Sequence, residues 1–357
     1  MTQAGATILI IGAGDLGLRI SVGLSNDPLV REIVIAGRRQ RGSQAAALLN
    51  DSSECPVRFR IADALNRSEI ERLLKQLRPD LVIQCASLLS PWYISGRDSP
   101  AAAALRCAGF AAQLPAQLPI VRSVMEAVRE VGFNCPVVNC SFPDLTHPIL
   151  KCAELAPTIG AGNAAMIWRR IRSALRSLNS ESVPLVRVVA HHVHVTSCIL
   201  SQPPQSGSPR PRVFLEDSGR PAHDIAYMAP PLTSDRSLNA LSAASSLPVI
   251  RSLLPGGAAL RISTPAPFGL PGGYPVRIGD GVIDLDLPDG VELDEVIRFQ
   301  HSCGRMDGVE RILPDGTVAF TEEFRAIITP FSREMAEPLA PQDCLTRFQI
   351  LKSVLGI

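Results

Sequence analysis

The stretch Ile8–Gly17, ILIIGAGDLG, decides the fold of this chain. Its apolar first half predicts a strand buried on both faces, and its glycines stand where that strand would turn into a helix. In such a turn Gly12 permits the sharp bend and Gly14 lets a pyrophosphate approach the backbone, while Gly17 lets the helix pack closely on the strand. The motif predicts a dinucleotide-binding turn, with a purely structural glycine-rich turn as the alternative.

The helix after this turn is expected to begin near Leu16, and its free N–H groups would hold the phosphates. Ligands of parallel sheets bind at the carboxyl ends of the strands, so residues at later strand ends are expected to join the site. The predicted dinucleotide-binding residues are Gly12, Gly14, Asp15, Leu16, Gly17, Arg38, Arg39, Ala86 and Asn139.

The residues after the second strand, Glu32–Ala36, bear on which dinucleotide binds. An NAD site usually carries an acidic residue there to accept hydrogen bonds from the ribose. This chain has Gly37-Arg38-Arg39 instead. Because a guanidinium binds a 2′-phosphate through charge-assisted hydrogen bonds, NADP is favoured over NAD, with Arg38 as the first candidate and Arg39 as the second. The alternative is an ordinary solvated basic turn.

Composition narrows the class of protein. The 357 residues are 46% hydrophobic and 19% charged, with a formal net charge of +1, which is typical of a globular chain and gives no reason to expect nucleic acid or membrane partners. Nine cysteines show no C-x-x-C pair or zinc-like spacing, so we expect reduced thiols and a cytoplasmic protein. Neither a signal peptide nor a stretch of bilayer length is evident.

Strands and helices alternate through the first 160 residues, and this pattern predicts an α/β fold: a Rossmann-type doubly wound parallel sheet. The second half, with a helix near Ala164–Leu178, a strand at Leu185–Val195 and several short later strands, predicts an α+β second domain. The expected division is an NADP-binding domain at 1–160, a catalytic domain at 161–330, and a C-terminal segment at 331–357. Its helix, Leu345–Leu355, would pack back on the first domain.

The middle of the chain resembles the lactate/malate dehydrogenase superfamily. That family has a helix, a strand ending in Asn-Pro-x-Asp-x-Leu-Thr and a Gly-x-Gly turn in this order, and the similar stretches here are Leu118–Val128, Val137–His147 and Thr158–Asn163. Its next landmark is a strand whose end carries the acid/base histidine, and the resemblance places His192 there. Met306–Ile312 is similar to the family's closing strand turn.

The chain also departs from that pattern. The family's catalytic Asp would fall near Met166, and its arginine one helical turn later would be Arg169 or Arg170. Substrate-loop arginines would come from Arg97 or Arg106. The N-terminal segment also resembles saccharopine-dehydrogenase-like and extended short-chain reductase families, but the Tyr-x-x-x-Lys signature of the short-chain enzymes is absent.

Hydride transfer needs a proton donor beside the new oxygen or nitrogen, and the histidine cluster His191, His192 and His194 offers one. In a continuous strand His192 and His194 would share a face. They are the expected catalytic pair, with Arg169 for a substrate carboxylate and Asn139 for the nicotinamide ribose or substrate carbonyl. No third ligand supports a metal site, so none is expected; packing roles for the histidines remain an alternative.

Two further segments have open interpretations. Asp144 would cap a helix starting near Leu145 or orient a histidine. The stretch Ser87–Arg97 lies where a substrate lid would hang, and Trp92 and Tyr93 in it would either close over the cofactor or anchor the loop.

These observations favour an NADP-dependent oxidoreductase acting on a small keto/hydroxy or imino/amino acid. The alternative is a non-catalytic, redox-sensing NADP-binding protein that kept the fold and lost the chemistry. A weaker third option is a metal-requiring, NAD-using glycosidase built on the same scaffold. The expected partners are a small-molecule substrate and, from the resemblance, a second copy of the chain.

Overall fold

A computed structural model describes residues 5–39, 41–132, 134–178, 183–205, 207–216 and 219–357. Its first part is a six-stranded parallel sheet in the order β3-β2-β1-β4-β5-β6, which is the strand order typical of dinucleotide-binding folds. The strands are β1 (Ala6–Ile11), β2 (Val30–Gly37), β3 (Val57–Ile61), β4 (Leu81–Gln84), β5 (Val137–Asn139) and β6 (Ile159–Gly160).

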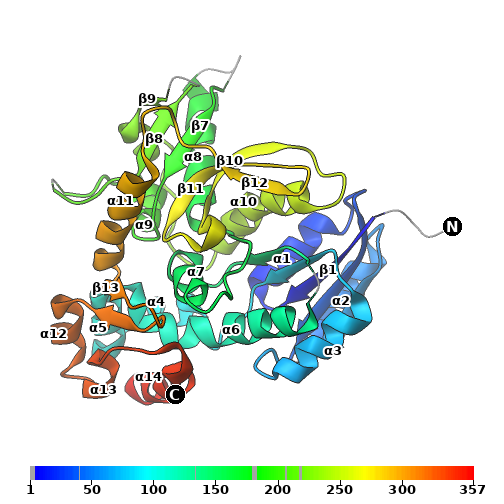
Figure 1. Cartoon of the computed structure of the whole chain (residues 1–357), viewed down its shortest axis with the longest axis horizontal. Helices are drawn as coiled ribbons and strands as arrows, with labels where there is room; N and C mark the ends of the chain where they lie inside the picture. The colour runs from blue at the N-terminus through cyan, green and yellow to red at the C-terminus, as the bar shows by residue number, and fades with distance from the viewer. Residues whose placement is uncertain (1–4, 40, 133, 179–182, 206, 217–218) are drawn as a thin grey trace.

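Side chains of β1 alternate between two buried layers. Ile8 and Ile10 belong to the cluster shared with α1 (Asp15–Leu24) and α8 (Asn163–Leu178), whereas Leu9 and Ile11 belong to the cluster shared with α3 (Arg67–Leu77) and α6 (Leu114–Val131). Because both faces are covered, the strand is apolar throughout, as its sequence predicts. The predicted doubly wound sheet is confirmed (Figure 1).

The second part consists of small antiparallel sheets and helices, which confirms the predicted α+β character (Figure 1). The sheets are β7 (Val186–Val189), β8 (Arg212–Leu215) and β9 (Arg220–Pro221); β10 (Leu260–Pro265), β11 (Gly273–Gly279) and β12 (Val282–Leu285); and β13 (Val309–Ile312) with β14 (Val318–Phe320). The helices include α9 (His194–Leu200), α10 (Leu238–Leu253) and α11 (Leu293–Met306).

The remaining helices lie in the connections and at the end of the chain. They are α2 (Arg41–Asp51), α4 (Pro91–Ser95), α5 (Pro100–Ala108), η1 (Phe110–Gln113), α7 (Pro143–Lys151), η2 (His223–Tyr227), η3 (Pro267–Gly269), α12 (Glu322–Ile328), α13 (Arg333–Ala336), η4 (Pro341–Asp343) and α14 (Cys344–Leu355).

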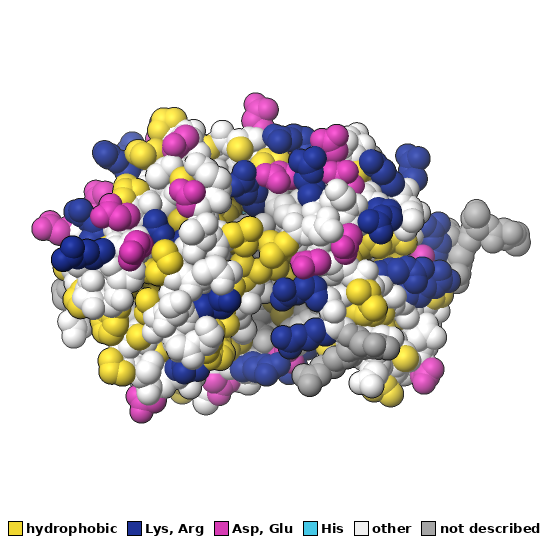
Figure 2. Space-filling model, turned by 90° about the horizontal axis from the view of Figure 1, so that it is seen from below, with side chains coloured by type: hydrophobic (Ala, Val, Ile, Leu, Met, Phe, Trp, Pro, Cys, Tyr) yellow, Lys and Arg dark blue, Asp and Glu magenta, His cyan; other side chains and the backbone are white. Residues whose placement is uncertain are grey.

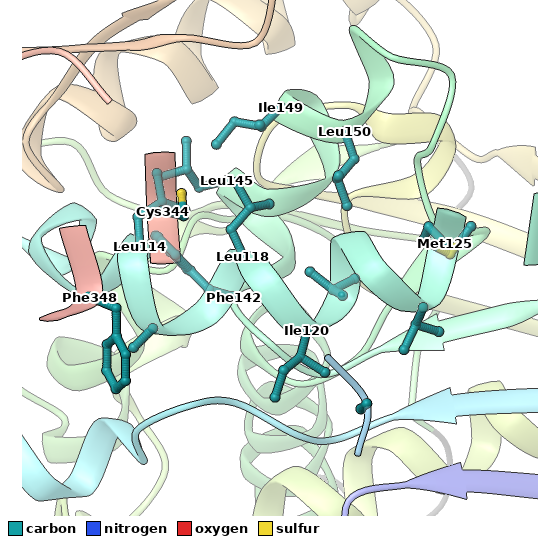
Figure 3. Packing of buried hydrophobic residues seen from close by; sticks show 14 of the residues in the cluster. Leu114, Leu118, Ile120, Met125, Phe142, Leu145, Ile149, Leu150, Cys344 and Phe348 are labelled. Atoms are coloured by element: carbon teal, nitrogen blue, oxygen red, sulfur yellow. The ribbon is translucent and has the colours of Figure 1, made fainter. Parts of the chain in front are cut away.

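The last helix, α14, packs on α6. Figure 3 shows Cys344 and Phe348 of α14 close to Leu114 and Leu118 of α6, and all four side chains are buried in one cluster. The end of the chain therefore lies against α6, one of the helices that cover the parallel sheet.

The predicted strand Leu185–Val195 is wrong at its carboxyl end. Regular strand β7 stops at Val189, and α9 begins at His194. The chain turns between them because the His191 backbone N–H donates to the His194 ring at 2.9 Å and the His192 N–H donates to Asp144 at 2.9 Å. These side-chain acceptors satisfy backbone groups that a ladder would otherwise pair.

Basic and acidic side chains are interspersed on the face seen from below in Figure 2, in keeping with the formal net charge of +1. Among the described residues no helix is long and apolar enough to cross a membrane.

Candidate functional site

The glycines of the first turn meet the steric demands predicted for them. Gly12 has φ +118°, and a Cβ there would lie 2.8 Å from the Ala86 nitrogen. A Cβ on Gly17 would lie 2.1 Å from the carbonyl oxygen of Gly12, whereas one on Gly14 would meet nothing within 4 Å. Packing inside the protein therefore explains Gly12 and Gly17, and Gly14 faces open space where a ligand can approach.

Backbone donors converge on that open space. The first backbone hydrogen bond of α1 runs from the Leu18 N–H to the carbonyl oxygen of Gly14, at 3.0 Å. Among the described residues the N–H groups of Gly14, Asp15 and Leu16 find no acceptor. Free donors at a helix N-terminus fit the pyrophosphate of a dinucleotide.

The Asp15 carboxylate is turned away from these donors. It accepts from Arg19 at 3.1 Å and from Asn239 of α10 at 2.7 Å. Burial alone would raise the pKa of Asp15, but these two partners outweigh it and lower the pKa. The predicted contribution of Asp15 to a dinucleotide site thus falls to its backbone N–H.

Arg38 and Arg39 follow β2 and are exposed. Within the described part of the chain neither side chain has an ion pair or hydrogen bond. Their guanidinium groups are therefore available at the strand end where the adenosine ribose is expected.

The predicted lid segment Ser87–Arg97 follows β4 and is hydrogen-bonded to α6 and α10. The Leu88 N–H donates to Ala116 of α6 at 2.9 Å, and the Trp92 indole donates to Asn239 of α10 at 3.0 Å. Because Asn239 also donates to Asp15, one hydrogen-bond chain joins this segment to the nucleotide turn.

His192 and Asp307 form the central pair of the second half of the site. The Nδ1 atom of His192 lies 3.2 and 3.1 Å from the two carboxylate oxygens of Asp307. Among the described residues Nε2 of His192 has no hydrogen-bond partner, and it is not sealed from solvent. A histidine held by a carboxylate at Nδ1 and open at Nε2 has the geometry of a general acid/base.

Electrostatic interactions favour the ionised forms of both His192 and Asp307. Burial would lower the pKa of His192, but the charge of Asp307 and the hydrogen bond to it outweigh burial, so the pKa of His192 is raised. Conversely, burial would raise the pKa of Asp307, and His192 outweighs it and holds the pKa below its ordinary value. Both shifts favour an imidazolium–carboxylate ion pair near neutral pH.

Aromatic rings and a second carboxylate fix the position of His192. Its ring lies 4.3 Å from the ring of Phe110 and 5.2 Å from that of Phe142, centroid to centroid. Its backbone N–H donates to Asp144 of α7, whose other oxygen accepts from Asn163 at the start of α8. Of the two roles predicted for Asp144, the structure favours orientation of a histidine over a helix cap, because α7 begins at Pro143.

Asp307 has His191 on its other side. The His191 Nδ1 atom lies 3.4 Å from Asp307 Oδ2, and burial lowers the pKa of His191. A pocket opens beyond His191, with Gln300 and His301 of α11 and Arg311 of β13 among its lining residues. Both histidines thus approach Oδ2 of one carboxylate, and the His192 ring also contacts Phe110.

The other expected catalytic residues lie elsewhere or are already bonded. His194 is in α9, not on a strand beside His192; its ring accepts from the His191 N–H, and burial lowers its pKa to about 3. Asn139 is fully buried and bonds Ser141 and Thr146. The Arg169 guanidinium is exposed and donates to Ala244 of α10 at 3.0 Å.

The remaining candidate arginines have structural partners. Arg106 donates to the carbonyls of Ile94 and Arg97, and Arg97 lies over the ring of Tyr93. Arg170 is buried and donates to backbone carbonyls, including that of Pro230 at 2.7 Å. Among the described residues no group of three or more His, Cys, Asp or Glu could hold a metal ion.

Asp307 is the functional candidate that the sequence analysis missed. The superfamily resemblance put a carboxylate at Met166, which instead packs with Ile199 and Leu238. Asp307 approaches from the end of α11, and its backbone and side chain also accept the N–H groups of Ala111 and Phe110. Its only sequence signal was its place in the Met306–Ile312 segment.

No protein-family model and no curated protein matches this sequence. Solved structures with a similar fold include lactate dehydrogenase from Eimeria maxima with NADH and oxamate, at TM-score 0.53 and 15% identity, covering 85% of this chain and 92% of that one. Malate dehydrogenase from Picrophilus torridus has TM-score 0.52 and 15% identity, covering 85% and 95%.

The minor L-lactate dehydrogenase from Enterococcus mundtii is similar at TM-score 0.50 and 16% identity, covering 85% of this chain and 96% of that one. The predicted resemblance to lactate and malate dehydrogenases is therefore confirmed at the level of the fold.

Proposed function

We propose that this chain is an NADP-dependent oxidoreductase that transfers a hydride to or from a small keto/hydroxy or imino/amino acid. The observation that carries the proposal is the His192–Asp307 pair, in which His192 lies three residues beyond the end of β7 and is open at Nε2. The similar solved structures are lactate and malate dehydrogenases, which supports this reaction class.

The dinucleotide would lie over the turn Gly12–Gly17, with its pyrophosphate at the free N–H groups of α1. Arg38 and Arg39 support a 2′-phosphate and hence NADP. When bound, the nicotinamide supplies or accepts the hydride.

In the reducing direction, His192 in its protonated form donates the Nε2 proton to the oxygen or nitrogen of the substrate as the double bond is reduced. The Asp307 carboxylate accepts a hydrogen bond from Nδ1–H, which stays on the ring, and stabilises the positive charge of the ring before transfer. In the oxidising direction neutral His192 accepts that proton. Phe110 and Phe142 pack against each other and against the His192 ring, which limits the directions in which Nε2 can point.

Arg169 remains our candidate for the substrate carboxylate. One of its five N–H groups is used on Ala244, which leaves the others available. Asn139 shapes the end of β5 through its bonds to Ser141 and Thr146, and we assign it this positioning role next to the nicotinamide ribose.

The alternative of a non-catalytic NADP-binding protein was motivated by the missing carboxylate partner of His192. Asp307 lies beside His192 from another part of the chain, and this pairing supports the enzyme over the alternative.

The test is turnover of a panel of small keto and imino acids with NADPH, comparing the wild type with His192→Gln. We expect at least one substrate to be reduced, and His192→Gln to lose a factor of about 10²–10⁴ in kcat while NADPH affinity is unchanged.

The matched control is His301→Gln, which alters an exposed histidine in the neighbouring pocket and should leave kcat unchanged. Equal activity of His192→Gln and the wild type would refute the assigned role, and a wild type that reduces no substrate would favour the non-catalytic reading.

A further inference from the structure

Two cysteines lie close together at the carboxyl ends of neighbouring strands, where the dinucleotide is expected. Cys85 and Cys140 each follow the last residue of a strand, and those strand ends, Gln84 of β4 and Asn139 of β5, are paired neighbours. The two Sγ atoms lie 3.7 Å apart, and the Cys140 N–H donates to Gln84 at 2.8 Å. They are the two thiols of adjacent parallel strands, and both are only partly buried.

Their position ties them to the nucleotide turn. A Cβ on Gly12 would lie 3.0 Å from the carbonyl carbon of Cys85, so the turn rests on this segment. Cys85 and Cys140 also border the same buried cluster as Ala13 and Leu16 of the turn and its helix. A change in the geometry of the thiols is therefore transmitted to the turn directly.

We propose that Cys85 and Cys140 are an oxidation site that forms a reversible disulfide with peroxides, and that the disulfide weakens dinucleotide binding. Neighbouring strands lie about 4.8 Å apart, within the range of about 4.4–6.8 Å that Cα atoms of a disulfide span. The sulfurs need to close from 3.7 Å to about 2.05 Å, which side-chain rotation and a small shift of the strand ends provide.

The chemistry balances with a hydroperoxide as the oxidant. One sulfur, as thiolate, attacks a peroxide oxygen; the O–O bond breaks, a sulfenic acid forms, and the other oxygen leaves as water or alcohol after taking up a proton. The second sulfur then attacks the sulfenic sulfur, the S–O bond breaks and water leaves. Two thiols lose two protons and two electrons, and the peroxide is reduced. A dithiol or another thiol restores the pair by exchange.

The surroundings of Cys85 limit its ionisation. The hydrogen bond to Cys140 and burial raise the pKa of the Cys85 thiol well above its ordinary value, which disfavours its thiolate form. Cys107 and Cys152 are exposed, and among the described residues neither thiol contacts another sulfur, so they offer no internal partner for a disulfide.

The expected loss of dinucleotide affinity follows from the position of the disulfide. Drawing the ends of β4 and β5 together moves Ala86, whose nitrogen a Gly12 Cβ would already meet at 2.8 Å, so the turn cannot keep its geometry unchanged. This consequence rests on the proposed dinucleotide site, whereas formation of the disulfide does not.

The experiment treats the full chain with hydrogen peroxide and maps its peptides by mass spectrometry with and without reductant. We expect one cross-link, Cys85 to Cys140, that dithiothreitol reverses. NADPH titration of the same samples should show affinity about tenfold weaker in the oxidised protein and restored on reduction, a change of about 1.4 kcal/mol.

The control variants are Cys140→Ser and, separately, Cys107→Ser with Cys152→Ser. Oxidised Cys140→Ser should keep its NADPH affinity, and the exposed-cysteine variant should still form the cross-link. Absence of the Cys85–Cys140 peptide pair after peroxide overturns the proposed oxidation site. A cross-link with unchanged NADPH affinity overturns its regulatory consequence, and a cross-link in a protein that binds no dinucleotide overturns the proposed function instead.

Discussion

The two halves of the candidate site are built in opposite ways. The nucleotide turn comes from six consecutive residues, Gly12–Gly17, whose backbone and packing requirements are local. The acid/base pair joins His192 to Asp307, 115 residues apart, and depends on where α7, α11 and η1 place them. A local motif can be recognised in the sequence, whereas a pair of residues that are distant in the sequence can be recognised only in the folded structure.

Asp307→Asn tests the assembled half, and we expect its effect on kcat to be the largest after that of His192→Gln. The amide keeps an oxygen for the Phe110 N–H, but it removes the charge and places a donor toward His192 Nδ1, which disfavours the productive tautomer. We expect kcat to fall by about 10²–10³, within the range for loss of acid–base function, with NADPH affinity retained. Steady-state kinetics and NADPH titration measure both.

Glu310→Gln is the matched control for Asp307→Asn. It removes an exposed carboxylate of β13 that pairs with Arg305 and lines the neighbouring pocket. Unchanged kcat is expected there; a loss equal to that of Asp307→Asn would mean that the general negative charge of this region matters and not the pair.

Gly17→Ala and Gly14→Ala test the local half. The added methyl group on Gly17 collides with the Gly12 carbonyl, and we expect destabilisation by about 1–3 kcal/mol, the usual cost of overpacking. The added group on Gly14 meets open space, so stability should stay within about 0.5 kcal/mol while NADPH affinity falls. Denaturant unfolding and NADPH titration separate the two; equal behaviour of the variants would count against a ligand above Gly14.

Arg38→Ala tests the predicted choice of NADP. Loss of a charge-assisted contact to a 2′-phosphate should weaken NADPH binding by about tenfold or more, with little change for NADH. Arg39→Ala should have the smaller effect. Equal weakening of both dinucleotides, or of neither, would assign these arginines to the solvated basic turn.

The smallest expected effect is on stability against pH. Because the folded protein raises the pKa of His192 above 6.5, the pair stabilises the fold fully below the unfolded pKa and this contribution disappears as pH rises through the folded value. The difference in free energy of unfolding between the wild type and His192→Gln should therefore shrink as the pH rises above 6.5 and through the folded pKa. Denaturant midpoints across that window measure it, and a difference that grows with pH would contradict the raised pKa.

Local patterns predicted much of the fold. Short strands such as Val57–Ile61 and Val282–Leu285 have the predicted bounds, because alternation and turn residues define them locally. The stretch Leu185–Val195 did not follow its β-branched composition, since hydrogen bonds from His191 and His192 to side-chain acceptors end the strand early. Tertiary partners overrode local propensity there.

Part of the candidate site could likewise be predicted from the sequence. Gly12, Gly14 and Gly17 lie as expected, and His192 is the histidine that the structure leaves open for chemistry. The pairing of His192 with His194 failed because it assumed a continuous strand, and Asp307 was missed because no spacing rule links it to His192.

The most direct test of the central claim, that the nucleotide turn and the His192–Asp307 pair belong to one site, is a proton NMR titration of the His192 ring with and without saturating NADPH. We predict that the free protein gives a His192 pKa above 6.5, and that NADPH shifts the His192 resonance while leaving those of His223 and His301 in place. A His192 resonance that does not move while NADPH is bound would separate the two halves and contradict the proposed oxidoreductase.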